Sequence, residues 1–222
     1  MFVRNVGKKS RYDFKNEILP ASYEMVKYAC LNFHYAKSIP RGKLVSFAIF
    51  EEKNFVGVFV FSMGANNNIG RPFNLLQGEV IELTRIALQK HKNPVTYYLS
   101  RCIKLIKKNS PSVKMIVSYS DFEYQGHLGK IYQAGNWLYL GVIKGDDRQY
   151  FYKGKWTHER TITSLSLEER QKLRAILPTR KNSDKFKYIF PMTKALQKEW
   201  RKVGKPYPKE LDGKGSFNAE KI

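Results

Sequence analysis

Apolar residues recur at two spacings along the chain, and each spacing predicts a different kind of element. Spacings of three and four residues place apolar side chains on one face of two predicted helices, 23–31 and 94–108. The runs that alternate or stay apolar are typical of strands, and they cover residues 44–50, 54–61, 79–88 and 113–119. The first two of these runs flank Glu51, Glu52 and Lys53, which predicts an antiparallel hairpin.

Shorter elements continue this alternation in the second half of the chain. We predict a short helix over 128–135, a strand over 137–143 and a hairpin over 149–156 that turns at Lys153 and Gly154. The order of helices and strands predicts an α/β fold, with a mixed central sheet flanked by helices.

The composition changes from Thr157 onward and becomes rich in basic residues. Ser166 and Glu169 form a capping-box pattern for a helix over 167–176, and residues 180–188 are predicted as a basic strand or arm. We therefore expect a main domain over 1–156 that carries the chemistry. A basic helical or extended C-terminal extension over 157–222 is expected to contact nucleic acid.

The net charge points to a polyanionic partner. Lys and Arg number 40 against 19 Asp and Glu, a formal net charge of +21. We favour nucleic acid over a membrane, because no basic helix with a clean apolar face stands out and no apolar run approaches the roughly 18 residues of a span. The N-terminus lacks the apolar core of a secretory signal, so a cytoplasmic location is expected. Cys30 and Cys102 lie in helix-like segments and are predicted to be buried free thiols.

The densest group of polar residues lies directly after the apolar run that ends at Val117. Residues 118–141 read SYSDFEYQGHLGKIYQAGNWLYLG and combine Ser, Tyr, Asp, His, Gln and Asn side chains. Polar groups at the exit of a strand often line a site. The alternative is a polar connection between strand and helix, with Tyr132, Trp137 and Tyr139 as core aromatic residues.

The order of elements resembles the acetyltransferase-like (GNAT) fold, in which two central parallel strands part and hold an acyl donor. Here those strands are residues 79–88 and 113–119. The resemblance implies a loop of pattern Q/R-x-x-G-x-G/A after the first strand, whose backbone amides bind the pyrophosphate of coenzyme A. Residues 89–94 read QKHKNP and contain no glycine, so close backbone approach to a pyrophosphate is not expected. Contact with phosphates through the side chains of Lys90, His91 and Lys92 stays open.

Four blocks of the sequence resemble the Mom family of bacteriophage DNA-modification proteins. They are FHYAKSIP (33–40), GVFVFSMGA (57–65), IELTRIAL (81–88) and the polar stretch 118–141. The resemblance implies conversion of adenine in DNA to the N6-carbamoylmethyl form in the cytoplasm of the bacterial host, which protects phage DNA from restriction. Adenine N6 is a poor nucleophile and is paired in a duplex, so such an enzyme must flip the base and assist proton transfer.

This chemistry assigns expected roles to residues in the four blocks. Tyr35, Tyr119 and Trp137 are expected to stack on the base, and Gln133 and Asn136 to read its edge. Asp121 is placed to take the N6 proton and Arg85 to neutralise an oxyanion. The catalytic candidates are His34, Tyr35, Arg85, Ser118, Asp121 and Tyr132, and the substrate-binding candidates are Tyr119, His127, Gln133, Asn136 and Trp137.

His34 has several possible roles, namely base, proton shuttle or metal ligand. A set of His34, Asp121 and His127 would provide a 2-His-1-carboxylate site for iron, so a metal is left open. The other cofactor expectation is an activated acyl donor, either acetyl-CoA or glycyl-tRNA, since a glycyl ester holds every atom of the carbamoylmethyl group.

The expected partners are double-stranded DNA and, if the donor is glycyl-tRNA, tRNA; monomer and homodimer both remain open. Phosphate contacts are expected from Arg170, Lys172, Arg174, Arg180, Lys181, Lys185 and Lys187. Two alternative functions are kept. One is an N-acetyltransferase that acts on a protein or a small amine, and the other is a DNA-binding protein without catalytic activity.

Overall fold

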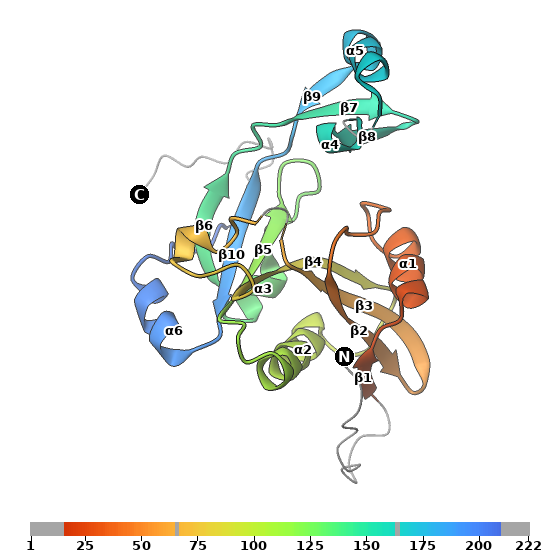
Figure 1. The fold of residues 1–222 in the computed structure, drawn as a ribbon. Helices are drawn as coiled ribbons and strands as arrows, with labels where there is room; N and C mark the ends of the chain where they lie inside the picture. Colours follow the sequence, from red (N-terminus) through yellow and green to blue (C-terminus); the bar gives the residue numbers. More distant parts are fainter. Residues whose placement is uncertain (1–15, 65–66, 163–164, 210–222) are drawn as a thin grey trace. The chain divides into compact units, whose positions relative to one another are not determined.

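The computed structural model describes residues 16–64, 67–162 and 165–209, which belong to two compact units (Figure 1). Unit 1 comprises the chain up to Val117 together with Pro191–Gln197, and unit 2 comprises Ser118–Phe190 together with the chain from Lys198. The two units divide between Val117 and Ser118, whereas the composition changes at Thr157. The separate C-terminal extension over 157–222 stays a prediction.

Unit 1 is built on an antiparallel sheet whose strands follow one another in the order β1-β2-β3-β4. The strands are β1 (Asn16–Pro20), β2 (Leu44–Glu51), β3 (Asn54–Ser62) and β4 (Val80–Leu88). The hairpin predicted around Glu51 is confirmed as β2 and β3. Strand β1, which pairs with β2, is absent from the prediction because its pattern is short and its pairing is not local.

Strand β5 (Met115–Asp121) follows β4 in parallel, as the sequence predicts. The parallel ladder joins Val80–Glu82 to Met115–Val117 and ends there, although both strands continue. The connection between them is helix α2 (Val95–Asn109), whose apolar face is buried through residues such as Leu99, Cys102 and Ile106. A strand, a crossover helix and a parallel strand form the βαβ unit that organises the sheet.

Helix α1 (Tyr23–Asn32) packs on the sheet of unit 1. Val26, Ala29 and Cys30 form one cluster with Val58, Val60 and Ala87 of the neighbouring strands. The close approach of β3 and β4 depends on Gly57, which has a φ of +144°. A Cβ at this position would lie 2.0 Å from the carbonyl oxygen of Ala87, so no other residue fits without a shift of the backbone.

Unit 2 continues the β5 strand and contains two sheets. In the first, the strand order is β5-β10-β6, formed with β6 (Leu138–Ile143) and β10 (Lys185–Pro191), and β10 is antiparallel to β6. The second has the order β8-β7-β9, formed by β7 (Arg148–Tyr152), β8 (Lys155–His158) and β9 (Thr179–Lys181). The predicted hairpin over 149–156 is confirmed as β7 and β8. The basic stretch 180–188 divides between β9 and β10, and only the second belongs to the larger sheet.

Short helices complete unit 2. Helix α3 (Lys130–Ala134) precedes β6, and α4 (Glu159–Ile162) follows β8. The predicted capping box of α5 (Leu167–Ile176) is confirmed, because Ser166 and Glu169 bond to each other's backbone amides. Helix α6 (Lys194–Arg201) extends from unit 1 into unit 2.

The α/β fold predicted from the order of elements is confirmed, with a mostly antiparallel central sheet and flanking helices. No helix in the described part of the chain is both long enough and apolar enough to span a bilayer. Cys30 and Cys102 are buried free thiols, as predicted, and burial raises the pKa of both.

Candidate active site

In unit 1, the segment that follows α1 holds two of the predicted site residues, His34 and Tyr35. The helix ends at Asn32, and a turn closes where Lys37 N donates to the carbonyl oxygen of His34 at 3.1 Å. The His34 side chain is 8% exposed, whereas that of Tyr35 is 50% exposed. The two rings lie 4.3 Å apart between centroids and are tilted by 30°. Tyr35 therefore presents an aromatic ring to solvent, and His34 lies buried beside it.

The backbone of this segment determines the tautomer of His34. The amide N–H of Ala36 donates to His34 Nδ1 at 3.1 Å. Because Nδ1 accepts a hydrogen bond, the neutral ring carries its proton on Nε2. A histidine that ligates a metal through Nε2 has the opposite arrangement, with its other ring N–H donated to an acceptor. This geometry favours a hydrogen-bond donor at Nε2 over a general base or an iron ligand.

Arg85 of β4 anchors the same segment. Its Nη2 donates to Ser38 Oγ at 3.3 Å, its Nε to the Ser38 carbonyl oxygen at 3.5 Å, and its Nη1 to the Thr84 carbonyl oxygen at 2.7 Å. Within the described residues, these bonds use three of the five guanidinium N–H donors. The block FHYAKSIP and the block IELTRIAL are therefore joined in space through Arg85 and Ser38.

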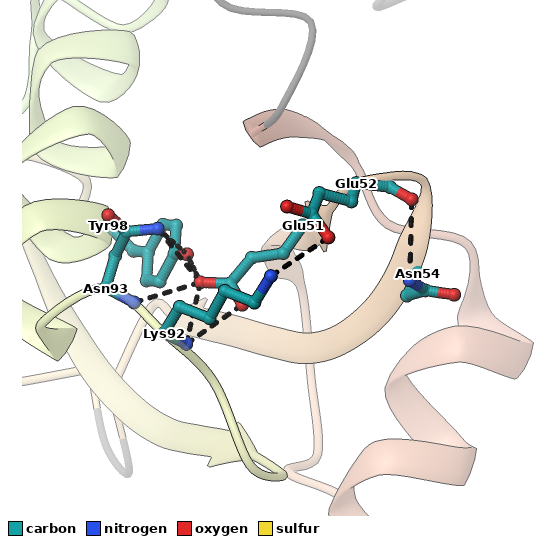
Figure 2. A network of polar contacts seen from close by, with 6 residues as sticks. All are labelled: Glu51, Glu52, Asn54, Lys92, Asn93 and Tyr98. Carbon is teal, nitrogen blue, oxygen red and sulfur yellow. Dashed lines mark hydrogen bonds and ion pairs between the residues drawn. The ribbon is translucent and has the colours of Figure 1, made fainter.

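The start of α2, where the acetyltransferase resemblance implies a phosphate site, is filled by a carboxylate of the protein itself (Figure 2). Glu51, at the end of β2, is 6% exposed. Its carboxylate accepts the amide N–H of Lys92 at 2.9 and 3.1 Å and that of Asn93 at 3.0 Å. The side-chain amide of Asn93 donates to it at 3.0 Å, and the Tyr98 hydroxyl also donates to it.

These contacts keep Glu51 ionised. Burial opposes the charge of the carboxylate, but the hydrogen bonds that it accepts outweigh this effect and lower the pKa of Glu51 to about 2. Burial and the bond to Glu51 raise the pKa of the Tyr98 hydroxyl, so Tyr98 stays a donor. An ionised carboxylate thus sits on the amides that precede α2, where an anion is favoured.

Binding of a coenzyme A pyrophosphate through these backbone amides does not fit this arrangement. A pyrophosphate at the start of α2 would need the amides of Lys92 and Asn93, and both already donate to Glu51. The negative charge of Glu51 would also repel the phosphates. The residues of this chain therefore do not form the pyrophosphate site that the fold resemblance implies.

In unit 2, Ser118 and Tyr132 are joined inside an aromatic core. Ser118 Oγ donates to the Tyr132 hydroxyl at 2.8 Å, and the two residues are 0% and 7% exposed. The Tyr132 ring contacts Trp137 and Tyr188 at 5.1 Å between centroids. Gly129 allows this packing, because a Cβ there would lie 2.4 Å from the Tyr188 ring.

Trp137 is fully buried in unit 2, with 0% exposure. Its ring packs against Tyr132 and Phe190, and its carbonyl oxygen accepts from the Tyr207 hydroxyl at 2.7 Å. Tyr139 is also buried, which raises the pKa of its hydroxyl to about 12. For these aromatic residues the structure favours the core alternative over stacking on a substrate base.

Asp121 lies at the end of β5 and is half-buried. One oxygen, Oδ1, accepts from Tyr124 N at 3.0 Å, and the other, Oδ2, accepts from Ser183 Oγ at 2.9 Å. The Asp121 carbonyl oxygen accepts from His127 N at 2.9 Å. Asp121 therefore fixes the segment 121–127. A carboxylate has about four lone-pair sites, so each oxygen of Asp121 can accept one further hydrogen bond.

The remaining candidates of unit 2 differ in exposure. Asn136 is exposed and has a φ of +58°, a left-handed conformation that Asn tolerates where α3 ends. His127 is exposed, and Tyr119 and Gln133 are partly buried. Gln133 Nε2 donates to the Leu128 carbonyl oxygen at 3.1 Å and to the Tyr188 hydroxyl at 3.2 Å. Asn136 and Gln133 thus have structural roles that explain their presence without a substrate.

Several of the predicted phosphate-binding residues are paired with carboxylates in unit 2. Lys172 pairs with Glu168 at 2.7 Å, Arg174 with Glu159 at 2.5 Å, and Lys181 with Asp184 at 3.0 Å. The pKa of Lys187 is lowered by burial. Arg170 and Lys185 are partly buried. The guanidinium of Arg180 contacts the faces of two aromatic rings, those of Tyr124 and Trp156.

The predicted site residues divide between the two units. His34, Tyr35 and Arg85 belong to unit 1, and the other catalytic and substrate-binding candidates belong to unit 2. No three His, Cys, Asp or Glu side chains gather as a metal site in residues 16–64, 67–162 and 165–209. The expected iron set of His34, Asp121 and His127 is therefore not supported.

Three residues with clear roles are missing from the sequence-based candidates. Ser38 lies inside the block FHYAKSIP, so the resemblance that indicates His34 and Tyr35 could also have indicated Ser38. Ser183 donates to Asp121, and Glu51 accepts from Asn93 N. Both pairs are more than 40 residues apart in the sequence, so no local pattern predicts them. Glu51 was predicted only as part of a hairpin turn.

Acetyltransferases are among the solved structures that this chain resembles. The spermidine/spermine N-acetyltransferase SpeG from Vibrio cholerae has a TM-score of 0.48 and 11% identity, and the match covers 83% of this chain and 96% of that chain. The acetyltransferase from Salmonella typhimurium that modifies ribosomal protein L7/L12 has a TM-score of 0.46 and 10% identity, with 81% and 96% covered. A GNAT family acetyltransferase from Elizabethkingia anophelis with acetyl-CoA bound has a TM-score of 0.42 and 13% identity, with 81% and 99% covered.

One protein family matches nearly the whole described chain. The model of the Mom protein family matches residues 16–209. No curated protein matches the chain significantly. The matched range contains the four sequence blocks on which the resemblance to this family depends. The chain therefore belongs to the Mom protein family.

Proposed function

We propose that this transferase converts adenine in double-stranded DNA to N6-carbamoylmethyladenine and so protects phage DNA from restriction. The observation that carries the proposal is the match to the Mom family over residues 16–209. The formal net charge of +21 supports a nucleic acid as the substrate. A soluble amine such as a polyamine is itself cationic and would be repelled by such a surface.

The described residues fit separate parts of this reaction. Tyr35 has half of its surface exposed and can stack on an extruded adenine. Arg85 acts as a positioning residue, because it holds the segment that carries Tyr35 through Ser38. Trp137 is excluded from a stacking role because it is fully buried.

The donor that we propose is an activated glycyl ester, such as glycyl-tRNA. Adenine N6 attacks the ester carbonyl, an N–C bond forms, the ester C–O bond breaks, and the proton leaves with the alcohol. The glycyl amine then attacks C6 of the purine, a new C6–N bond forms, and the original C6–N6 bond breaks as its nitrogen takes the proton of the amine. The product is the carbamoylmethyl isomer, and no other atom is needed. Support comes from the Glu51 carboxylate, which takes the amides that a coenzyme A pyrophosphate would need. An acetyl group would also lack the amide nitrogen.

Reconstitution with defined donors tests this proposal. Purified protein is incubated with duplex DNA and either glycyl-tRNA or acetyl-CoA, each labelled with 14C in the acyl group. We expect label from the glycyl ester in deoxyadenosine and none from acetyl-CoA. Transfer from acetyl-CoA without transfer from glycyl-tRNA would rule out the glycyl donor and leave adenine as the acceptor.

Binding to double-stranded DNA is expected to depend steeply on salt. If the basic surface engages roughly six to ten phosphates, affinity falls by about 10³ to 10⁵ between about 50 and 200 mM salt. Fluorescence anisotropy with a labelled duplex measures this dependence. An affinity that stays constant over this range would argue against broad contact with the DNA backbone.

A further inference from the structure

The small sheet of unit 2 has one outward face that carries aromatic rings. In β7, β8 and β9 the register pairs Phe151 with Trp156 and Gln149 with Arg180. Side chains alternate between faces along a strand, so these four share a face. Phe151 and Trp156 are 41% and 37% exposed, whereas the next residues along, Tyr150 and Thr157, are 5% and 7% exposed. We call Phe151, Trp156 and Arg180 the aromatic face.

A guanidinium group is held within this face. Arg180 Cζ lies 4.1 Å from the centroid of the Tyr124 ring and 4.5 Å from that of the Trp156 ring. Arg180 Nε donates to Gln149 Oε1 at 2.8 Å, which fixes the plane of the group. The Tyr124 hydroxyl donates to the Lys181 carbonyl oxygen at 2.7 Å, and Phe151 meets Trp156 edge-on at 5.3 Å. The stack is thus ordered before any ligand binds.

The strands that form the small sheet carry basic side chains and no acidic ones. The β7–β8 hairpin and β9, residues 148–158 and 179–181, contain no Asp or Glu. Their basic residues are Arg148, Lys153, Lys155, Arg180 and Lys181. Arg180 belongs to the aromatic face, whereas Arg148, Lys155 and Lys181 occupy the alternate positions of their strands, and Lys181 pairs with Asp184 at 3.0 Å. Exposed rings beside the Arg180 guanidinium, on strands that carry further basic residues, match the two parts of a nucleic acid strand, its bases and its phosphates. A duplex, whose bases stack on each other, offers no base faces to such rings.

We propose that the aromatic face binds an unpaired stretch of DNA strand, with bases stacked on Trp156 and Phe151 and phosphates near the surrounding cations. The choice of DNA rests on the proposed function, since an enzyme that extrudes a base leaves unpaired nucleotides behind. Because every base has a π face, this contact tolerates any sequence. The aromatic face therefore holds opened DNA and does not select the target adenine.

Binding of a short labelled oligodeoxythymidine, followed by anisotropy, tests this inference. Trp156→Ala and Phe151→Ala are each expected to weaken single-strand binding about five- to hundredfold, the effect of losing one stacked base. Tyr23→Ala is the matched control, because Tyr23 is an exposed aromatic residue of α1 in unit 1. It is expected to bind as the wild type does.

A second readout separates stacking from a loss of folding. Trp156→Phe keeps a ring at this position and is expected to keep most of the affinity. A base stacked on Trp156 quenches its fluorescence, so the quenching seen in the wild-type protein is expected to disappear in Trp156→Phe. Wild-type quenching that persists in Trp156→Phe would place the base elsewhere and overturn the inference.

Three further results would also overturn it. They are wild-type affinity for the single strand in Trp156→Ala and Phe151→Ala, an equal loss of affinity for duplex and single strand, and tighter binding of an oligouridine than of the DNA. Nucleoside mass spectrometry on the same proteins keeps the two proposals distinguishable. Modified deoxyadenosine without any stacking effect contradicts only this inference, and a stacking effect without modified deoxyadenosine contradicts only the proposed function.

Discussion

Arg85→Gln is expected to lower adenine modification at least about a hundredfold while the protein stays folded. The guanidinium joins β4 to the segment 33–40 by two hydrogen bonds to Ser38. Gln is shorter and cannot span both acceptors, so the segment that carries His34 and Tyr35 loses its anchor. A displacement of about 1 Å of a group that positions a substrate costs on the order of 10² in rate. The measurement is the fraction of modified deoxyadenosine in DNA from expressing cells, with circular dichroism as the test of folding.

Arg41→Gln is the matched control, because Arg41 is an exposed residue close to the same segment and the substitution removes the same charge. We expect it to modify DNA normally. Ser38→Ala removes only the side-chain acceptor and is expected to have a smaller effect, roughly tenfold, since the contact with the carbonyl oxygen remains. Normal modification by a folded Arg85→Gln protein would show that this anchor is dispensable.

Glu51→Gln is expected to lower the free energy of unfolding by roughly 3 kcal/mol at neutral pH, which is the value of lowering the pKa from its usual 4.5 to about 2. The glutamine side chain keeps one acceptor oxygen and turns an NH₂ group toward donors such as Lys92 N and Asn93 N. Buried donors that lose their acceptor are costly. Urea unfolding of the two proteins measures the difference.

The pH dependence of this difference has a definite sign. Since folding lowers the pKa of Glu51, its contribution is complete above about pH 4.5 and declines as the pH falls toward 2. Wild type and Glu51→Gln should therefore approach each other in stability in acid. The control is Glu52→Gln, which breaks an exposed pair with Lys92 at 3.0 Å and is expected to change stability by less than about 1 kcal/mol. A difference between wild type and Glu51→Gln that grows in acid would contradict the assignment.

Local patterns were sufficient for the elements whose partners are close in sequence. The β2–β3 hairpin, α2 and the capping box of α5 are encoded by apolar spacing and by capping residues a few positions apart. The apolar pattern does not predict strand β1, and for 180–188 it predicts either a strand or an arm. In β10, buried Phe186 and Tyr188 alternate with Lys185 and Lys187, and only its place in the sheet shows which side is apolar.

The candidate site was predicted less completely than the fold, for physical reasons. The blocks indicated His34 and Arg85, but the hydrogen bond from Ala36 that fixes the tautomer of His34 depends on a turn that the sequence does not specify. Trp137 lies in a polar stretch and is nevertheless fully buried, because the aromatic core around Tyr188 forms from distant strands. The role of Glu51 depends on a hydrogen bond from Lys92 N, which is 41 residues away in the sequence, so no local motif predicts it.

Mass spectrometry of nucleosides, from the DNA of cells that express this chain, tests the central claim most directly. The wild-type protein is predicted to yield deoxyadenosine that carries the mass of one carbamoylmethyl group, and a folded Arg85→Gln protein to yield almost none. DNA in which every deoxyadenosine is unmodified, from cells that contain folded wild-type protein and the glycyl donor, would contradict the assignment of this chain as an adenine-modifying enzyme.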